Sequence, residues 1–161
     1  MRRLEITSLA IVASMSLLIA CGSDRRDKGI DADQAAIKTL IGKSIDAFVA
    51  RDWDEFVGTF SEDAVWMPPG SGILRGQDAW WSFVQPWWNS SAVIEIDITT
   101  EELIVSGDWA IERHSEFQVF TIGDNPEPIT AYFKAIWVFQ RQVDGTWKIS
   151  RYIWNESPPP A

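Results

Sequence analysis

Apolar and polar residues follow one pattern in the first part of the chain and another in the second. Between residues 31 and 60, apolar side chains recur every three or four positions, which is typical of helices with one buried side. Between residues 94 and 155, they often alternate with polar side chains, which is typical of strands with one buried face. The sequence therefore predicts helices first and a sheet after them.

Three helices are predicted. Asp31 and Gln34 form a capping box at the start of the first, and Asp52 caps a short second helix that ends at residues 61–63. The third starts at residues 76–78, and Pro86 kinks or ends it because proline has no N–H to donate. Short strands at 64–67 and 73–75 are predicted between the second and third helices.

A long hairpin is predicted around Asp144-Gly145, a dipeptide typical of tight turns. A turn centred there places Trp137 opposite Tyr152 and Ala135 opposite Trp154. One face of the hairpin is then aromatic and carries Phe133, Trp137, Phe139, Tyr152 and Trp154. A one-residue bulge would reverse that face.

Two further strands are predicted at 94–98 and 109–122. One face of the second carries Trp109, Ile111, Arg113, Ser115, Phe117 and Val119. The other face carries His114 between Glu112 and Glu116. Because the first face is the more apolar, we expect it to face the core and His114 to point outward to solvent or to a dimer partner.

This order of elements predicts an α+β fold. We expect a cone-shaped, curved antiparallel sheet with about three N-terminal helices packed on its concave face. The mouth of such a cone is a common place for a ligand.

Length and charge narrow the function. The chain has 161 residues, 46% of them hydrophobic, which is enough for one domain with a core. A net charge of −9 argues against nucleic acid as a partner. With one histidine, one cysteine and no phosphate-binding loop, we expect no metal and no cofactor.

The N-terminus predicts export. Residues 1–20 combine an early positive charge with an apolar run too short for a comfortable membrane span, and they end in a segment that resembles the lipobox of bacterial lipoproteins. We expect lipidated Cys21 to anchor the protein to the bacterial cell membrane or outer membrane; the alternative is an ordinary secretory signal with an incidental cysteine. Residues 21–30 are then a tether, 31–156 the domain and 157–161 a loose tail.

Several motifs together resemble the SnoaL-like, nuclear transport factor 2-like superfamily. They are Asp52-Trp53, the run 60–66, Pro68-Pro69-Gly70, Arg75-Gly76, the run 144–149 and Ile153-Trp154-Asn155. The resemblance covers about residues 31–156 and implies a cone-shaped domain, usually a homodimer, with a pocket between sheet and helices. It does not imply one activity, because the superfamily contains both enzymes and non-catalytic modules. Tyr152 stands where relatives tend to carry an aspartate.

The resemblance also suggests which residues line a pocket. We assign to it Trp66, Met67, Trp81, Trp87, Arg113, Phe117, Trp137, Tyr152, Trp154 and Asn155. Trp53, Trp109 and Trp147 are assigned to the core. Aromatic boxes bind flat apolar groups and can hold cations, although an aromatic core or dimer interface would account for the same residues.

Three residues are candidates for catalysis. Tyr152 or His114 could transfer a proton, and Arg113 could stabilise an oxyanion or carboxylate. Arg113 could equally form a structural ion pair with Asp63 or Glu62. We expect an exported protein that binds a small hydrophobic or aromatic molecule; the alternatives are a cofactor-free isomerase, cyclase or dehydratase and a non-catalytic assembly module.

Overall fold

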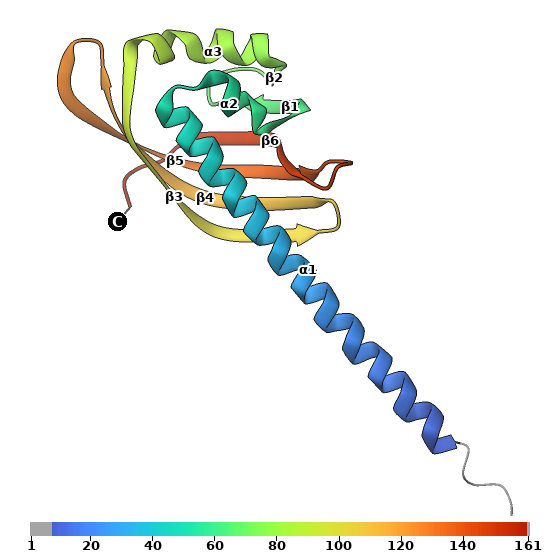
Figure 1. Ribbon diagram of the computed structural model, residues 1–161. Helices are drawn as coiled ribbons and strands as arrows, with labels where there is room; N and C mark the ends of the chain where they lie inside the picture. Colours follow the sequence, from blue (N-terminus) through green and yellow to red (C-terminus); the bar gives the residue numbers. More distant parts are fainter. Residues whose placement is uncertain (1–7, 161) are drawn as a thin grey trace, which may run out of the picture. The chain divides into compact units, whose positions relative to one another are not determined.

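The computed structural model describes the backbone of residues 8–160 and the side chains of residues 29–160. The predicted signal segment, Cys21 and most of the predicted tether therefore lie outside the residues whose side chains are described. The chain forms two compact units, residues 1–35 and 36–161. The described part of the first is the N-terminal portion of helix α1 (Ser8–Ala50), and the second contains all the remaining elements (Figure 1).

Helix α1 is longer than predicted. It runs through Asp31, which is therefore not its N-cap; no proline interrupts the residues before it. In the second unit, Ile37, Ile41 and Ala47 on α1 are buried, as their helical spacing predicted. Arg51 ends the helix with a positive φ of 60°. In the part of the chain with described side chains, no helix has the length and apolarity to cross a membrane.

Helix α2 (Trp53–Gly58) begins as predicted. Asp52 Oδ1 accepts a hydrogen bond from Glu55 N at 2.9 Å, the geometry of an N-cap. Residues 61–63 do not end α2 as predicted but belong to strand β1 (Phe60–Met67), which pairs with the short antiparallel strand β2 (Leu74–Arg75). Helix α3 (Gln77–Ser90) continues through Pro86 without ending there.

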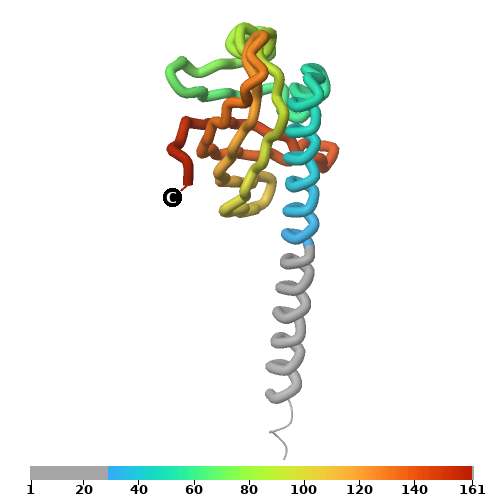
Figure 2. Tube along the Cα trace, turned by 90° about the vertical axis from the view of Figure 1, so that its left-hand side faces the viewer, coloured from blue at the N-terminus to red at the C-terminus, as the bar shows by residue number. Residues whose placement is uncertain are grey.

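One six-stranded sheet has the order β2-β1-β6-β5-β4-β3. Its long strands are β3 (Ser91–Ser106), β4 (Trp109–Ile122), β5 (Asn125–Arg141) and β6 (Trp147–Glu156). All neighbours are antiparallel except β1 and β6, which are parallel. Figures 1 and 2 show the long strands bending along their length, so that the β4–β5 turn lies near the end of α3, where Gly123 N donates to Ser90 O at 2.6 Å. The predicted α+β class with a curved sheet is confirmed.

The predicted hairpin is formed by β5 and β6, and its register is confirmed at both predicted pairs. The turn itself is different: Gln142 N donates to Thr146 O at 2.7 Å, which leaves a three-residue loop in which Gly145 has a φ of 86°. The pairing then shifts by one residue between Val138 and Phe139. This bulge compensates the extra loop residue and keeps Tyr152 opposite Trp137.

The core lies between the helices and the inner face of the sheet. It includes Trp80, Phe139 and Ile149, all of which are almost completely buried. Trp147 is buried and Trp53 packs against the core, in agreement with their assignment. Trp109 was assigned to the core wrongly: it is 44% exposed on the outer face of β4.

Candidate functional site

An aromatic cavity of about 300 Å³ lies in the second unit, on the inner side of the sheet. Eleven of its 17 lining residues are aromatic, four are aliphatic, and the other two are Ser44 and Gln118. The lining consists of Ser44, Ile45, Phe48, Phe56, Phe60, Trp66, Phe83, Val84, Trp87, Ile96, Ile98, Gln118, Phe120, Phe133, Trp137, Tyr152 and Trp154. The cavity thus has the size and the mainly apolar character of a small-molecule site.

The strands bring the cavity aromatics together through their register. Trp66 on β1 lies beside Tyr152 on β6, and Tyr152 lies beside Trp137 on β5. Tyr152 and Trp154 stack with ring centroids 4.3 Å apart, and both meet Trp66 edge to face at about 6 Å. The indole nitrogens of Trp66 and Trp137 are buried without a hydrogen-bond partner among the described residues.

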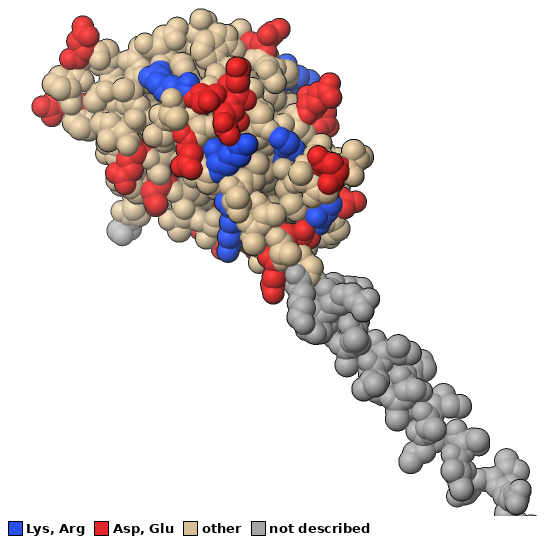
Figure 3. Space-filling model, viewed as in Figure 1, with Lys and Arg blue, Asp and Glu red and all other residues tan. Residues whose placement is uncertain are grey.

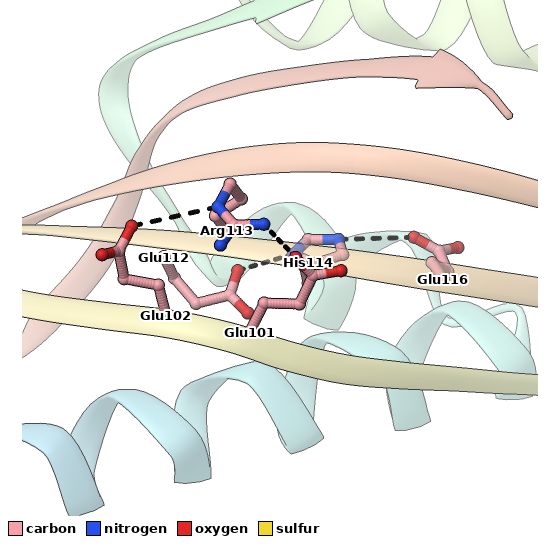
Figure 4. A network of polar contacts seen from close by, with 6 residues as sticks. All are labelled: Glu101, Glu102, Glu112, Arg113, His114 and Glu116. Atoms are coloured by element: carbon pink, nitrogen blue, oxygen red, sulfur yellow. Dashed lines mark hydrogen bonds and ion pairs between the residues drawn. The ribbon is translucent and has the colours of Figure 1, made fainter.

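A buried polar cluster continues the inner face of β4. His114 Nδ1 donates to Glu112 Oε2 at 2.5 Å, and His114 Nε2 lies 3.6 Å from Glu116 Oε2, within ion-pair distance (Figure 4). All three side chains are buried. Gln118, which lines the cavity two residues further along the strand, donates a hydrogen bond to Glu116 Oε1. We call Glu112, His114 and Glu116 the carboxylate–histidine cluster.

The cluster lies directly beside the cavity. Glu116 pairs with Ile98 on one side and with Phe133 on the other, and both of these residues line the cavity. The His114 ring meets the ring of Trp137, another lining residue, with centroids 4.9 Å apart. Because paired residues on neighbouring strands share a face, the cluster and the cavity lie on the same side of the sheet.

The cluster changes two pKa values. Burial disfavours the charged form of His114, but the hydrogen bond to Glu112, the contact with Glu116 and the negative charges of both outweigh it and raise its pKa from 6.5 to about 9. Burial raises the pKa of Tyr152 well above its usual 10.0, and the charges of Glu116 and Glu112 raise it further. At neutral pH, His114 is therefore a cation and Tyr152 a neutral phenol.

The orientation predicted for β4 is wrong. His114 does not point outward but is 1% exposed on the inner face. Arg113 lies on the outer face, where it pairs with Glu101 and Glu102 rather than with Asp63 or Glu62 (Figure 4). The physical reason is that the two buried carboxylates hold the imidazolium inside, whereas the more apolar face of the strand lies outside the domain.

The predicted pocket residues divide into two groups. Trp66, Trp87, Trp137, Tyr152 and Trp154 line the cavity. Met67, Trp81, Arg113, Phe117 and Asn155 are not among its lining residues. The four that lie on strands each come next to an inward-facing residue, so they belong to the opposite face; they are Met67, Arg113, Phe117 and Asn155. Trp81, on α3, packs against Trp53 with ring centroids 5.0 Å apart.

Sequence reasoning missed much of the lining. Gln118 and Phe120 follow the two-residue alternation that carries His114, so a correct choice of face on β4 would have found them. Ile98 comes beside Glu116 only through strand pairing, which the sequence alone does not show, whereas Phe133 was already predicted on the aromatic face of the hairpin. Ser44 and Phe48 lie on the predicted apolar helix and gave no separate signal.

The described residues give less support to a metal site or to a charged binding surface. In the portion with described side chains, no group of three or more His, Cys, Asp or Glu residues is arranged to hold a metal. Figure 3 shows acidic and basic side chains interspersed over the face it draws. Neither observation adds a second site to the cavity and its adjoining cluster.

Comparison with known proteins finds one matching family model and several solved structures with a similar fold. The family model described as SnoaL-like domain matches residues 41–152. A ketosteroid isomerase-like protein from Erwinia carotovora atroseptica is 21% identical, with a TM-score of 0.68 over 78% of this chain and 96% of the other. Hexachlorocyclohexane dehydrochlorinase LinA-type3 from Novosphingobium barchaimii is 19% identical, with a TM-score of 0.66 over 82% and 91%. ActVI-ORFA from Streptomyces coelicolor is 14% identical, with a TM-score of 0.66 over 78% and 98%. No curated protein matches.

Proposed function

Since the chain belongs to the SnoaL-like domain family, as its sequence motifs indicated, we propose that it binds a small hydrophobic or aromatic molecule in the aromatic cavity. The observation that carries the proposal is the lining itself: 15 of 17 residues are aromatic or aliphatic. Burying an apolar molecule against such a surface stabilises the complex by about 25 cal/mol for each Å² removed from water.

Binding is tested with N-phenyl-1-naphthylamine, a neutral probe whose fluorescence rises in apolar surroundings. We expect saturable binding to the wild-type protein. Ile98→Trp, which enlarges a lining side chain, should abolish it, whereas Ile111→Trp on the exposed outer face should not. No saturable binding, or equal binding by both variants and the wild type, would contradict the proposal.

A second candidate function is proton transfer at a carbon next to a carbonyl group, without a cofactor. The carboxylate–histidine cluster favours it, because His114 Nε2 and Glu112 Oε1 are buried without hydrogen-bond partners among the described residues. An imidazolium can donate a proton and a carboxylate can accept one. Arg113 has no part in this candidate, because it lies on the opposite face of β4.

The measurement for this candidate is deuterium uptake from D₂O by small cyclic ketones. Catalysed exchange that disappears in His114→Gln, while the naphthylamine probe still binds, would support proton transfer. Exchange at the uncatalysed rate across the ketones tested would count against it.

We also propose that the domain pairs with a second copy through the outer face of its sheet. Exposed apolar side chains gather there, namely Ile104, Trp109, Ile111, Ile136 and Ile153. Register places Ile104 beside Ile111, and Ile136 beside Ile153. A contiguous apolar surface of this kind is typical of an interface. Sedimentation velocity should give the mass of a homodimer.

The anchor at Cys21 belongs to the same proposal. An exported protein held to the bacterial cell membrane or outer membrane by a lipid would offer its cavity to molecules outside the cytoplasm. Cys21→Ser should release the protein from the membrane fraction. Continued membrane association of that variant would refute the anchor.

A further inference from the structure

The cavity has two glutamates and one histidine beside it, and no residue with an ionised side chain among its described lining residues. Glu116 lies between two lining residues, Ile98 and Phe133, and its carboxylate is bonded to a third, Gln118. Glu112 pairs with Trp137, which also lines the cavity. Among the described lining residues, none is Lys, Arg or His.

The carboxylate–histidine cluster contains more acidic than basic side chains. Two glutamates, Glu112 and Glu116, lie on either side of the one histidine. Arg113, the next residue along β4 from His114, points to the outer face and is paired there with Glu101 and Glu102. Burying a carboxylate is costly, and a single histidine between two glutamates leaves room for a further cation to offset that cost.

The aromatic walls favour the same kind of ligand. The faces of Trp and Tyr rings carry partial negative charge and attract a cation placed over them. Trp66, Tyr152 and Trp154 all line the cavity and contact one another there. Burial is the main cause of the raised pKa of Tyr152, and the charges of Glu116 and Glu112 raise it further, so these carboxylates act on a residue of the cavity wall.

We infer that the cavity selects organic cations: molecules with a flat or apolar body and a protonated amine or quaternary ammonium centre. The inference rests on the proposed binding function and narrows it to one class of ligand. The apolar body fills the aromatic lining, and the positive centre lies toward Glu116 over the aromatic rings. Anions of the same shape are excluded by the same charge.

The test compares two probes of the same shape, benzyltrimethylammonium and neopentylbenzene, in which a carbon replaces the nitrogen. Each is titrated as a competitor of N-phenyl-1-naphthylamine on the wild-type protein. We expect the cation to bind about tenfold more tightly than its neutral counterpart, from ring and carboxylate attraction together. Phenylacetate, the anionic comparison, should compete least.

The outcomes separate this inference from the proposed function. Equal or tighter binding of neopentylbenzene overturns the selection for cations and leaves the hydrophobic site standing. Failure of the naphthylamine and of both probes to bind overturns the site as well.

A substitution at Glu116 tests whether its carboxylate causes the preference for the cation. Glu116→Gln should remove most of the preference for the cation, measured as the ratio of the affinities for benzyltrimethylammonium and neopentylbenzene. Its matched control is Glu102→Gln on the outer face, which should keep the full preference. An unchanged preference in folded Glu116→Gln would contradict the role of the carboxylate. If that variant does not fold, the wild-type comparison of the two probes alone decides.

Discussion

Replacing His114 tests the carboxylate–histidine cluster through the pH dependence of stability. Folding raises the pKa of this imidazole from 6.5 to about 9, because Glu112 and Glu116 hold its proton. At about 1.4 kcal/mol for each pKa unit, a rise from 6.5 to about 9 corresponds to roughly 3 kcal/mol of folding free energy. Since the folded state holds the proton more tightly, this contribution is fully present below pH 6.5. It declines as the pH rises and is lost once the pH passes about 9.

The assay is urea unfolding of the wild type and of His114→Gln between pH 6 and 10. Gln keeps a donor for Glu112 but does not titrate, so the stability difference between the two proteins should shrink by about 3 kcal/mol over this range. Arg113→Gln, one residue away on the outer face, is the control and should follow the wild-type profile. Parallel profiles for wild type and His114→Gln would refute a protonated His114 in the folded protein.

Three further predictions concern the fold and the interface. Asp52→Ala removes the N-cap of α2 and should lower the free energy of unfolding by about 1 kcal/mol in urea titrations, with no loss if the cap bond to Glu55 is unimportant. Ile149→Ala, at a fully buried position, should cost about 2–5 kcal/mol by the same measurement, whereas Val143→Ala in the exposed loop should change little. Ile136→Glu, on the outer face, should give a folded monomer by light scattering; a persistent dimer would place the interface elsewhere.

The aromatic hairpin shows what local sequence can predict. Its register at Trp137 and Tyr152 follows from a turn signal and two-residue alternation. The prediction succeeded although the loop has three residues, because a bulge near Ser150 restores the pairing. An error of one residue would have reversed the face. The agreement therefore depends on a compensation that the sequence does not reveal.

Strand β4 shows what a single sequence does not settle. The pattern of apolar residues correctly predicted that the two faces of β4 differ. It wrongly predicted that the more apolar face is the one in the core. The domain leaves that face exposed and buries Glu112, His114 and Glu116, which satisfy much of one another's charge. Hydrophobicity alone does not distinguish a core from an apolar outer face. Arg113 was predicted on the wrong face of β4 for the same reason.

The lining of the cavity was predicted only in part. Five aromatic residues chosen for the pocket do line it, because they lie on inward positions of β1, β5 and β6 or on α3. Met67 and Asn155 are not among the lining residues, because they alternate along their strands with Trp66 and Trp154. Ile98 comes beside Glu116 through pairing between separate strands. Its place in the site is a property of the sheet rather than of any short motif.

The proposed ligand site of this protein is the aromatic cavity. A crystal structure of the protein grown with N-phenyl-1-naphthylamine would locate the bound probe. We expect electron density for the probe inside the cavity, in contact with Trp66, Trp137 and Trp154. Saturable binding in solution combined with a probe located on the outer face of the sheet, and none in the cavity, would contradict it.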